Sequence, residues 1–125
     1  MSPMNDMPSS DSLEQLRQRL AKFADDRDWQ QFHSPKNLSM ALIAEAAELV
    51  EHFQWLSEAQ SLELDEEKRS QVRLELADIL IYLIRTADRL GIDLVSAAND
   101  KIAINDGRYP VEKVKGKAGR AEDFR

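Results

Sequence analysis

The stretch that most constrains the fold is residues 37–56, NLSMALIAEAAELVEHFQWL, which has the periodicity of one amphipathic helix with carboxylates inside its apolar stripe. Four leucines lie within about 60° of Glu45 on the helical wheel: Leu38, Leu42, Leu49 and Leu56. Glu48 lies at the edge of the same stripe. A buried carboxylate is unfavourable in its ionised form unless a positive charge pairs with it, and this stretch contains no lysine or arginine. The sequence therefore predicts a cation as the missing partner.

Residues 72–90, VRLELADILIYLIRTADRL, repeat this pattern. Glu75 lies among apolar residues on the helical wheel, and Asp78 follows three positions later. If the two helices pack antiparallel, as a short connection favours, the four carboxylates of Glu45, Glu48, Glu75 and Asp78 can converge. Oxygen ligands without cysteine suit Mg²⁺, and Mn²⁺ is the alternative.

Size and charge exclude several classes of protein. A chain of 125 residues predicts one domain, and a net charge of −6 argues against nucleic acid as the main partner, since phosphate binding normally leaves a basic surface. No apolar run reaches the length of a membrane span, and the first residues lack the apolar stretch of a signal peptide. The absence of cysteine excludes disulfides and thiolate zinc sites. We expect a cytoplasmic protein without a membrane partner.

The sequence predicts an all-α fold, in which each protomer is an antiparallel bundle of four main helices. The expected helices cover residues 13–27, residues 37–56, the stretch between an N-cap at Asp65 and a C-cap at Gly91, and residues 94–106 after an N-cap at Asp93. Residues 1–11 are predicted to be a disordered leader, residues 12–112 the domain, and residues 113–125 a mobile charged tail. The third helix is apolar nearly all round, which predicts that a homo-oligomer, most simply a tetramer, completes the core.

Two further groups of residues suit a ligand. Trp29, Phe32 and His33 lie in the connector 28–36, and such rings either pack in the core or contact a ligand. Lys101 and Asn105 lie on one ridge of the last helix, and Arg108 joins them if the last turn extends. Two cations and an amide in a line suit phosphate oxygens, although a solvated face with ordinary ion pairs has the same spacing.

The acidic residues would also fit a solvated helix face or a di-iron bundle. Di-iron sites use Glu-x-x-His pairs, and neither His33 nor His52 completes that spacing. The chain also lacks a glycine-rich phosphate loop and a recognisable protein nucleophile.

The pairs Glu45-x-x-Glu48 and Glu75-x-x-Asp78 resemble the ExxE…ExxD signature of the all-α nucleoside triphosphate pyrophosphohydrolases. The likeness is strongest to the MazG-like dCTP pyrophosphatases and covers about residues 13–112. It rests on four further segments: RDWQQFHSPKNL at 27–38, FQW at 53–55, DILIYLI at 78–84, and K-x-x-x-N-x-x-RYP at 101–110.

The resemblance implies Mg²⁺-dependent cleavage of a nucleoside triphosphate, dCTP or a modified dCTP, to the monophosphate and pyrophosphate. It also implies a helical protomer that assembles through four-helix bundles as a dimer of dimers. It implies that Glu45, Glu48, Glu75 and Asp78 hold the metal. It also implies two sets of substrate contacts: Trp29, His33, Asn37, Trp55 and Tyr82 around base and sugar, and Lys101, Asn105, Arg108 and Tyr109 at the phosphates. The sequence leaves open dUTP or another nucleotide as substrate, and a non-catalytic oligomeric adaptor as a different class of function.

Overall fold

The computed structural model describes residues 12–124, and all regular elements in this range are helices. The helices are α1 (Leu13–Asp26), the 3₁₀ turn η2 (Gln30–Phe32), α2 (Pro35–Glu51), α3 (Glu58–Ser61), α4 (Glu66–Arg89), α5 (Leu94–Arg108), α6 (Val111–Val114) and the 3₁₀ turn η3 (Ala121–Phe124). The prediction of an all-α fold is therefore confirmed. The predicted leader, residues 1–11, lies outside the described residues.

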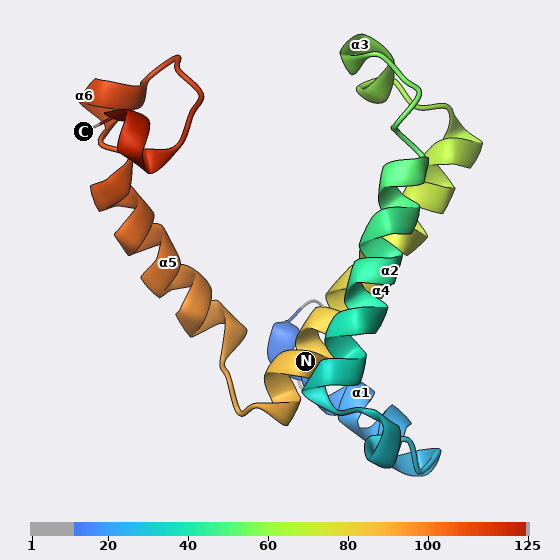
Figure 1. Cartoon of the computed structure of the whole chain (residues 1–125). Helices are drawn as coiled ribbons and strands as arrows, with labels where there is room; N and C mark the ends of the chain where they lie inside the picture. Colours follow the sequence, from blue (N-terminus) through green and yellow to red (C-terminus); the bar gives the residue numbers. More distant parts are fainter. Residues whose placement is uncertain (1–11, 125) are drawn as a thin grey trace, which may run out of the picture. The chain divides into compact units, whose positions relative to one another are not determined.

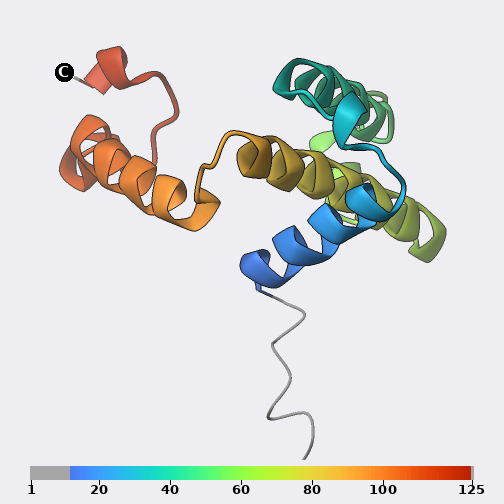
Figure 2. The same cartoon turned by 90° about the horizontal axis from the view of Figure 1, so that it is seen from below.

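The chain divides into two units at Gly91 and Ile92, and each unit is described by itself. In the first unit α2 and α4 run side by side in opposite directions (Figure 1). Helix α1 packs on another side of α4, so that α4 lies between α1 and α2 (Figure 2). The antiparallel packing expected from the short connection is thus present, with α3 inside that connection.

Side-chain caps set the first residue of each of the five helices α1 to α5. The side chains of Ser12, Ser34, Ser57, Asp65 and Asp93 each accept a hydrogen bond from the backbone N–H three positions later. Such a cap satisfies one of the N–H groups that the first helical turn leaves without a partner. The N-caps expected at Asp65 and Asp93 are confirmed.

Helix α2 differs from the predicted 37–56 at both ends. It begins two residues earlier because Pro35 occupies the first helical position, where its missing N–H is harmless and its fixed φ suits a helix. It ends at Glu51, and residues 52–56 form turns. Ser57 then takes extended backbone angles as the cap of α3 in a capping box with Gln60. The chain must therefore leave the axis of α2 before Ser57.

Two turns of the first unit have backbone angles in the left-handed region. Gly91, just after α4, has φ 67°, the left-handed conformation that commonly ends a helix and that glycine adopts without a steric penalty. Asp28, between α1 and η2, has φ 55°, and aspartate is among the few other residues that tolerate this region. After this turn the Trp29 N–H donates to the Ala24 carbonyl at 2.8 Å, which ties the connector back to the end of α1.

The buried core of the described chain is small. Its apolar members are Ala24, Leu38, Val72, Ile84 and Ala87, and Arg85 is the one buried charged residue among residues 12–124. Large apolar side chains on α4 stay exposed, including Leu74 at 60% and Leu76 at 52%. The sequence predicts that α4 packs against another subunit as well as against its own. In the single chain this apolar surface is exposed, and the oligomer stays a prediction.

The second unit contains α5, α6 and η3. Helix α5 extends two residues past the predicted end, to Arg108. The Tyr109 and Phe124 rings meet edge to face with centroids 6.1 Å apart, so residues near the C-terminal end fold back on the end of α5. The predicted tail 113–125 thus includes part of α6 and η3, while its mobility stays a prediction.

Candidate metal and nucleotide site

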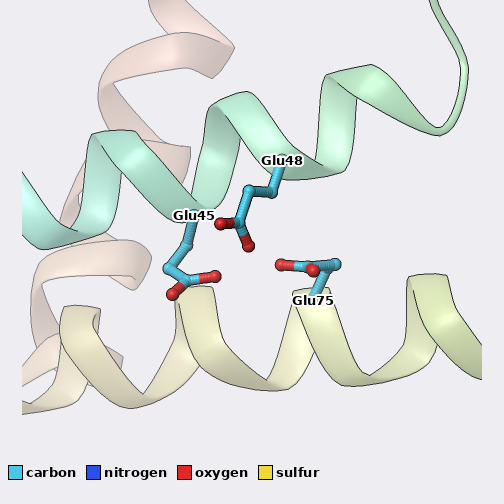
Figure 3. Close-up of side chains that lie close together, drawn as sticks. All are labelled: Glu45, Glu48 and Glu75. Atoms are coloured by element: carbon cyan, nitrogen blue, oxygen red, sulfur yellow. The ribbon is translucent and has the colours of Figure 1, made fainter.

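The packing of α2 on α4 brings three carboxylates together. Glu45 and Glu48 point from α2 toward Glu75 on α4, and Figure 3 shows the three side chains converging between the two helices. One carboxylate oxygen from each lies within 4.8 Å of the others. We call Glu45, Glu48 and Glu75 the acidic cluster.

Two oxygens of the acidic cluster are buried without a partner. Glu45 Oε2 and Glu75 Oε2 are inaccessible to solvent and accept no hydrogen bond. Glu48 is the exposed member. Buried polar atoms in native proteins nearly always have a partner, so these two carboxylate oxygens are candidate ligands for a bound group.

The pKa of Glu45 also reflects the burial and crowding of these carboxylates. Burial and, after it, the carboxyl groups of Glu75, Glu48 and Asp78 raise the pKa of Glu45 from 4.5 to about 7. Among the described residues, no ion pair includes a member of the cluster. Within residues 12–124, no lysine, arginine or histidine side chain therefore pairs with the cluster.

Asp78, the fourth predicted ligand, lies one turn after Glu75 on α4 and is half-buried. Its oxygens are not among those within 4.8 Å of one another, yet it is close enough to raise the pKa of Glu45. The structure thus brings three of the four predicted carboxylates into direct proximity and leaves Asp78 at the side.

The connector places Trp29 and His33 next to each other. Their ring centroids are 6.2 Å apart, and the Trp29 ring also meets Phe23 of α1 at 5.7 Å. Trp29 is 43% exposed, which leaves part of the indole accessible. Asn37 Nδ2 donates to the Phe32 carbonyl at 3.1 Å, so this predicted substrate contact also holds the connector onto α2.

Trp55 and Tyr82 have different surroundings. Trp55 lies in the turns after α2 and is 87% exposed, so packing within the chain does not explain it. Tyr82 is half-buried on α4, one turn after Asp78. Of the predicted base contacts, Trp55 is thus the one most available to a partner or ligand.

The predicted phosphate contacts all lie in the second unit. Lys101, Asn105 and Arg108 share one ridge of α5, because the last helical turn does include Arg108. Tyr109 is the C-cap, and its ring centroid is 5.7 Å from the Arg108 guanidinium carbon. A cavity of about 300 Å³ beside Arg108 is also lined by Lys113 and Glu122.

Comparison with known proteins identifies the chain's relatives. The model of the MazG-like family matches residues 41–124. The chain belongs to this family. It is 42% identical to rat dCTP pyrophosphatase 1 over 115 residues, which cover 90% of this chain and 68% of the rat protein. It is 43% identical to the human dCTP pyrophosphatase 1 over 101 residues, or 79% and 59% of the two chains.

A solved structure supports the same assignment. A pyrophosphatase from Archaeoglobus fulgidus aligns with a TM-score of 0.74 and 38% identity, over 78% of this chain and 92% of that one. The resemblance to MazG-like pyrophosphohydrolases predicted from the sequence is confirmed, and with it the prediction that the chain is an enzyme of the nucleoside triphosphate hydrolase class. None of the helices in residues 12–124 is both long and apolar enough to traverse a bilayer.

Two groups of polar residues near these sites did not stand out in the sequence. Arg85 directly follows the apolar run of α4, and its burial depends on the fold. Lys68 Nζ lies 3.3 Å from His52 Nδ1, which joins the start of α4 to the end of α2 beyond the acidic cluster. Arg85 donates to His33 and Gln30 of the connector. These contacts and the one between Lys68 and His52 join residues far apart in the chain, so no local spacing predicts them.

Proposed function

We propose that the chain hydrolyses dCTP, or a dCTP modified on its base, to the monophosphate and pyrophosphate in a Mg²⁺-dependent reaction, and so removes this nucleotide from the cellular pool. The coarser class, nucleoside triphosphate pyrophosphohydrolase, follows from the MazG-like family and the pyrophosphatase relatives. The observation that carries the proposal is the acidic cluster, with its two orphaned oxygens and with no ion pair to a cationic side chain in the described part of the chain.

The cluster fits a hard divalent cation. All of its donors are carboxylate oxygens, which suit Mg²⁺ and, second, Mn²⁺. Glu45, Glu48 and Glu75 would hold the ion, with Asp78 as a fourth ligand from α4. When bound, Mg²⁺ supplies positive charge toward phosphate oxygens and lowers the pKa of a water.

The chain's own residues have the remaining roles. A carboxylate of the cluster can accept a proton from the water that attacks phosphorus, and the exposed Glu48 is the accessible one. Trp29, Trp55 and Tyr82 offer ring faces for stacking on a base. His33 and Asn37 offer polar atoms for base and sugar, and Lys101, Asn105, Arg108 and Tyr109 offer donors for phosphates.

The test is pyrophosphate release from dCTP, 5-methyl-dCTP, dUTP, dTTP and ATP, with Mg²⁺, with Mn²⁺ and with EDTA. The expected result is metal-dependent release that is fastest with a cytosine nucleotide, and none with EDTA. If dUTP is preferred, the proposed substrate is wrong, while the proposed reaction, release of pyrophosphate from a nucleoside triphosphate, stands. No release from any member of the panel would overturn the proposal and favour an adaptor.

The proposed assembly is a homo-oligomer, a tetramer built as a dimer of dimers. The support is the exposed apolar surface on helices, such as Leu74 and Leu76 on α4 and Ile43 on α2, because water disfavours such patches. Light scattering at micromolar concentration should give four times the chain mass of 14.3 kDa. A stable helical monomer would contradict this. The cytoplasmic location and the absence of nucleic-acid partners stay predictions.

A further inference from the structure

The network around Arg85 holds the connector against α4. Arg85 is 2% exposed, and each of its three guanidinium nitrogens donates a hydrogen bond. Nε donates to His33 Nδ1 at 3.3 Å, Nη1 to Asp88 at 3.0 Å, and Nη2 to Gln30 at 2.7 Å. Asp88 also accepts from Arg17 of α1 at 3.0 Å, so the network joins α1, the connector and α4.

The contact between Arg85 and His33 has a chemical consequence. A guanidinium has only donors and keeps its protons in proteins, so His33 Nδ1 must be the acceptor and carry no proton. In a neutral imidazole the other nitrogen, Nε2, then carries the hydrogen. Burial and the charges of Arg85 and Arg89 lower the pKa of His33 below 6.5, which keeps the ring neutral near pH 7.

The charged groups near His33, on every element packed against it, either lower its pKa as well or are already paired with another residue. From α4, Arg89 Nε donates to the His33 carbonyl at 3.1 Å, and Asp88, the nearby acid, is shared between Arg85 and Arg17. From the connector, Gln30 is neutral and Trp29 presents a ring. Among the described residues, the His33 ring makes no hydrogen bond other than that from Arg85.

We propose that Arg85 is a positioning residue that fixes His33 as a neutral Nε2–H donor, so that His33 recognises an uncharged acceptor oxygen of the nucleotide, a base carbonyl or a sugar hydroxyl. The role at the nucleotide rests on the proposed function. It excludes His33 as a cation for phosphates and as the general base, because a ring held with Nδ1 occupied and Nε2 protonated has no free lone pair.

The first test is ¹⁵N NMR of the imidazole nitrogens in the full-length protein, which needs no substrate. The chain has two histidines, and His52→Gln identifies the His33 signals. The expected spectrum at pH 7 has His33 as the Nε2–H tautomer, with a titration midpoint below 6.5. An Nδ1–H tautomer, or a midpoint at or above the ordinary value, would overturn the proposal whether or not the chain hydrolyses dCTP.

A matched pair of variants separates the Arg85 contact from simple docking of the connector. Arg85→Lys and Arg89→Lys both keep a positive charge and both lose a guanidinium that bonds the connector. Only Arg85→Lys removes the fixed donor to Nδ1. We expect mixed His33 tautomers in Arg85→Lys and the wild-type tautomer in Arg89→Lys. The same tautomer in both variants would overturn the positioning role.

The role of His33 at the nucleotide is tested by kinetics. Glutamine keeps an N–H donor near the place of Nε2 and an oxygen that can accept from Arg85, whereas leucine keeps neither. The expected KM for the preferred nucleotide is raised in both variants, by about threefold in His33→Gln and by about tenfold or more in His33→Leu. A large loss of kcat in His33→Gln would mean that His33 acts on protons and would overturn the donor role.

Discussion

Helix α4 carries two charged sites that differ in one respect. Around Glu75, three carboxylates meet with two buried oxygens that have no partner. Around Arg85, ten positions further on, each guanidinium nitrogen has an acceptor and Asp88 has two donors. The same helix thus contains an incomplete charge cluster and a complete one.

This difference distinguishes two roles of a buried charge, which are to stabilise the fold and to bind a ligand. A complete network gains its hydrogen bonds when the chain folds, so removing a member leaves other charges stranded. An incomplete cluster loses solvation and gains nothing until a ligand arrives, so removing a member relieves repulsion. The two sites should therefore respond to substitution with opposite signs of stability change.

The largest effect is expected at the acidic cluster. Glu48→Gln should lower kcat/KM for the preferred nucleotide by roughly a thousandfold or more, about 4 kcal/mol, because a metal ligand is lost. With EDTA, the melting temperature should be equal to that of wild type or higher. Glu51→Gln, on the same helix but outside the cluster, is the control and should keep its activity. Near-normal turnover of Glu48→Gln would refute the metal site.

The reverse behaviour is expected at the complete network. Arg85→Met removes a buried charge that has three acceptors, and should lower the free energy of unfolding by about 3 kcal/mol. Asp88 keeps only the donor from Arg17, Gln30 keeps only the longer one from Arg89, and the His33 ring loses its donor. Urea unfolding at fixed protein concentration measures this. An unchanged midpoint would show that the network contributes no net stability and would remove the contrast between the two sites.

Trp55→Ala tests whether this exposed ring serves ligand binding, like the acidic cluster, or stability, like the Arg85 network. At 87% exposure it contributes little to the core of the chain, so the melting temperature should change little. Loss of a base stack should raise KM by the equivalent of roughly 1–3 kcal/mol. Steady-state kinetics with the preferred nucleotide give the result. A variant that melts early and keeps its KM would show that Trp55 is structural, for instance between protomers.

The smallest effect is a dependence of stability on pH in the metal-free protein. The folded pKa of Glu45, about 7, lies above its ordinary value of 4.5, so the folded state binds this proton more tightly than the unfolded state. The free energy of unfolding should therefore fall as pH rises from 4.5 to 7 and then level off. Melting curves with EDTA should show a weaker fall in Glu45→Gln than in wild type. Equal slopes in both proteins would contradict the raised pKa.

Much of the fold was predictable because it depends on local signals. Asp65 and Asp93 cap their helices as expected, and the period of apolar residues located α1, α2, α4 and α5. The end of α2 was missed because the apolar pattern continues through residues 52–56, while the capping box at Ser57 turns the chain away. The apolar period predicts where a helix can continue, but it does not show that a cap further along the chain will end the helix earlier.

The acidic cluster was predictable for a different reason. A carboxylate at a leucine position is anomalous within one helix, so Glu45 and Glu75 were visible before any packing was known. The shortfall at Asp78 depends on the relative rotation of α2 and α4, which the sequence does not specify. The Arg85 network was invisible because an arginine at a helix end is ordinary until the connector covers it.

The geometry of the acidic cluster depends on the number of residues between each helix N-cap and the carboxylates that follow it. Ser34 and Asp65 pin the starts of α2 and α4, so Glu45 and Glu75 reach their places only at a fixed number of residues from those caps. One residue inserted between Ser34 and Glu45 would turn the α2 carboxylates by about 100° away from Glu75. The same insertion in the segment 57–64 would leave both counts intact. Length variation in this chain should therefore be tolerated in that segment and selected against between each cap and its carboxylate.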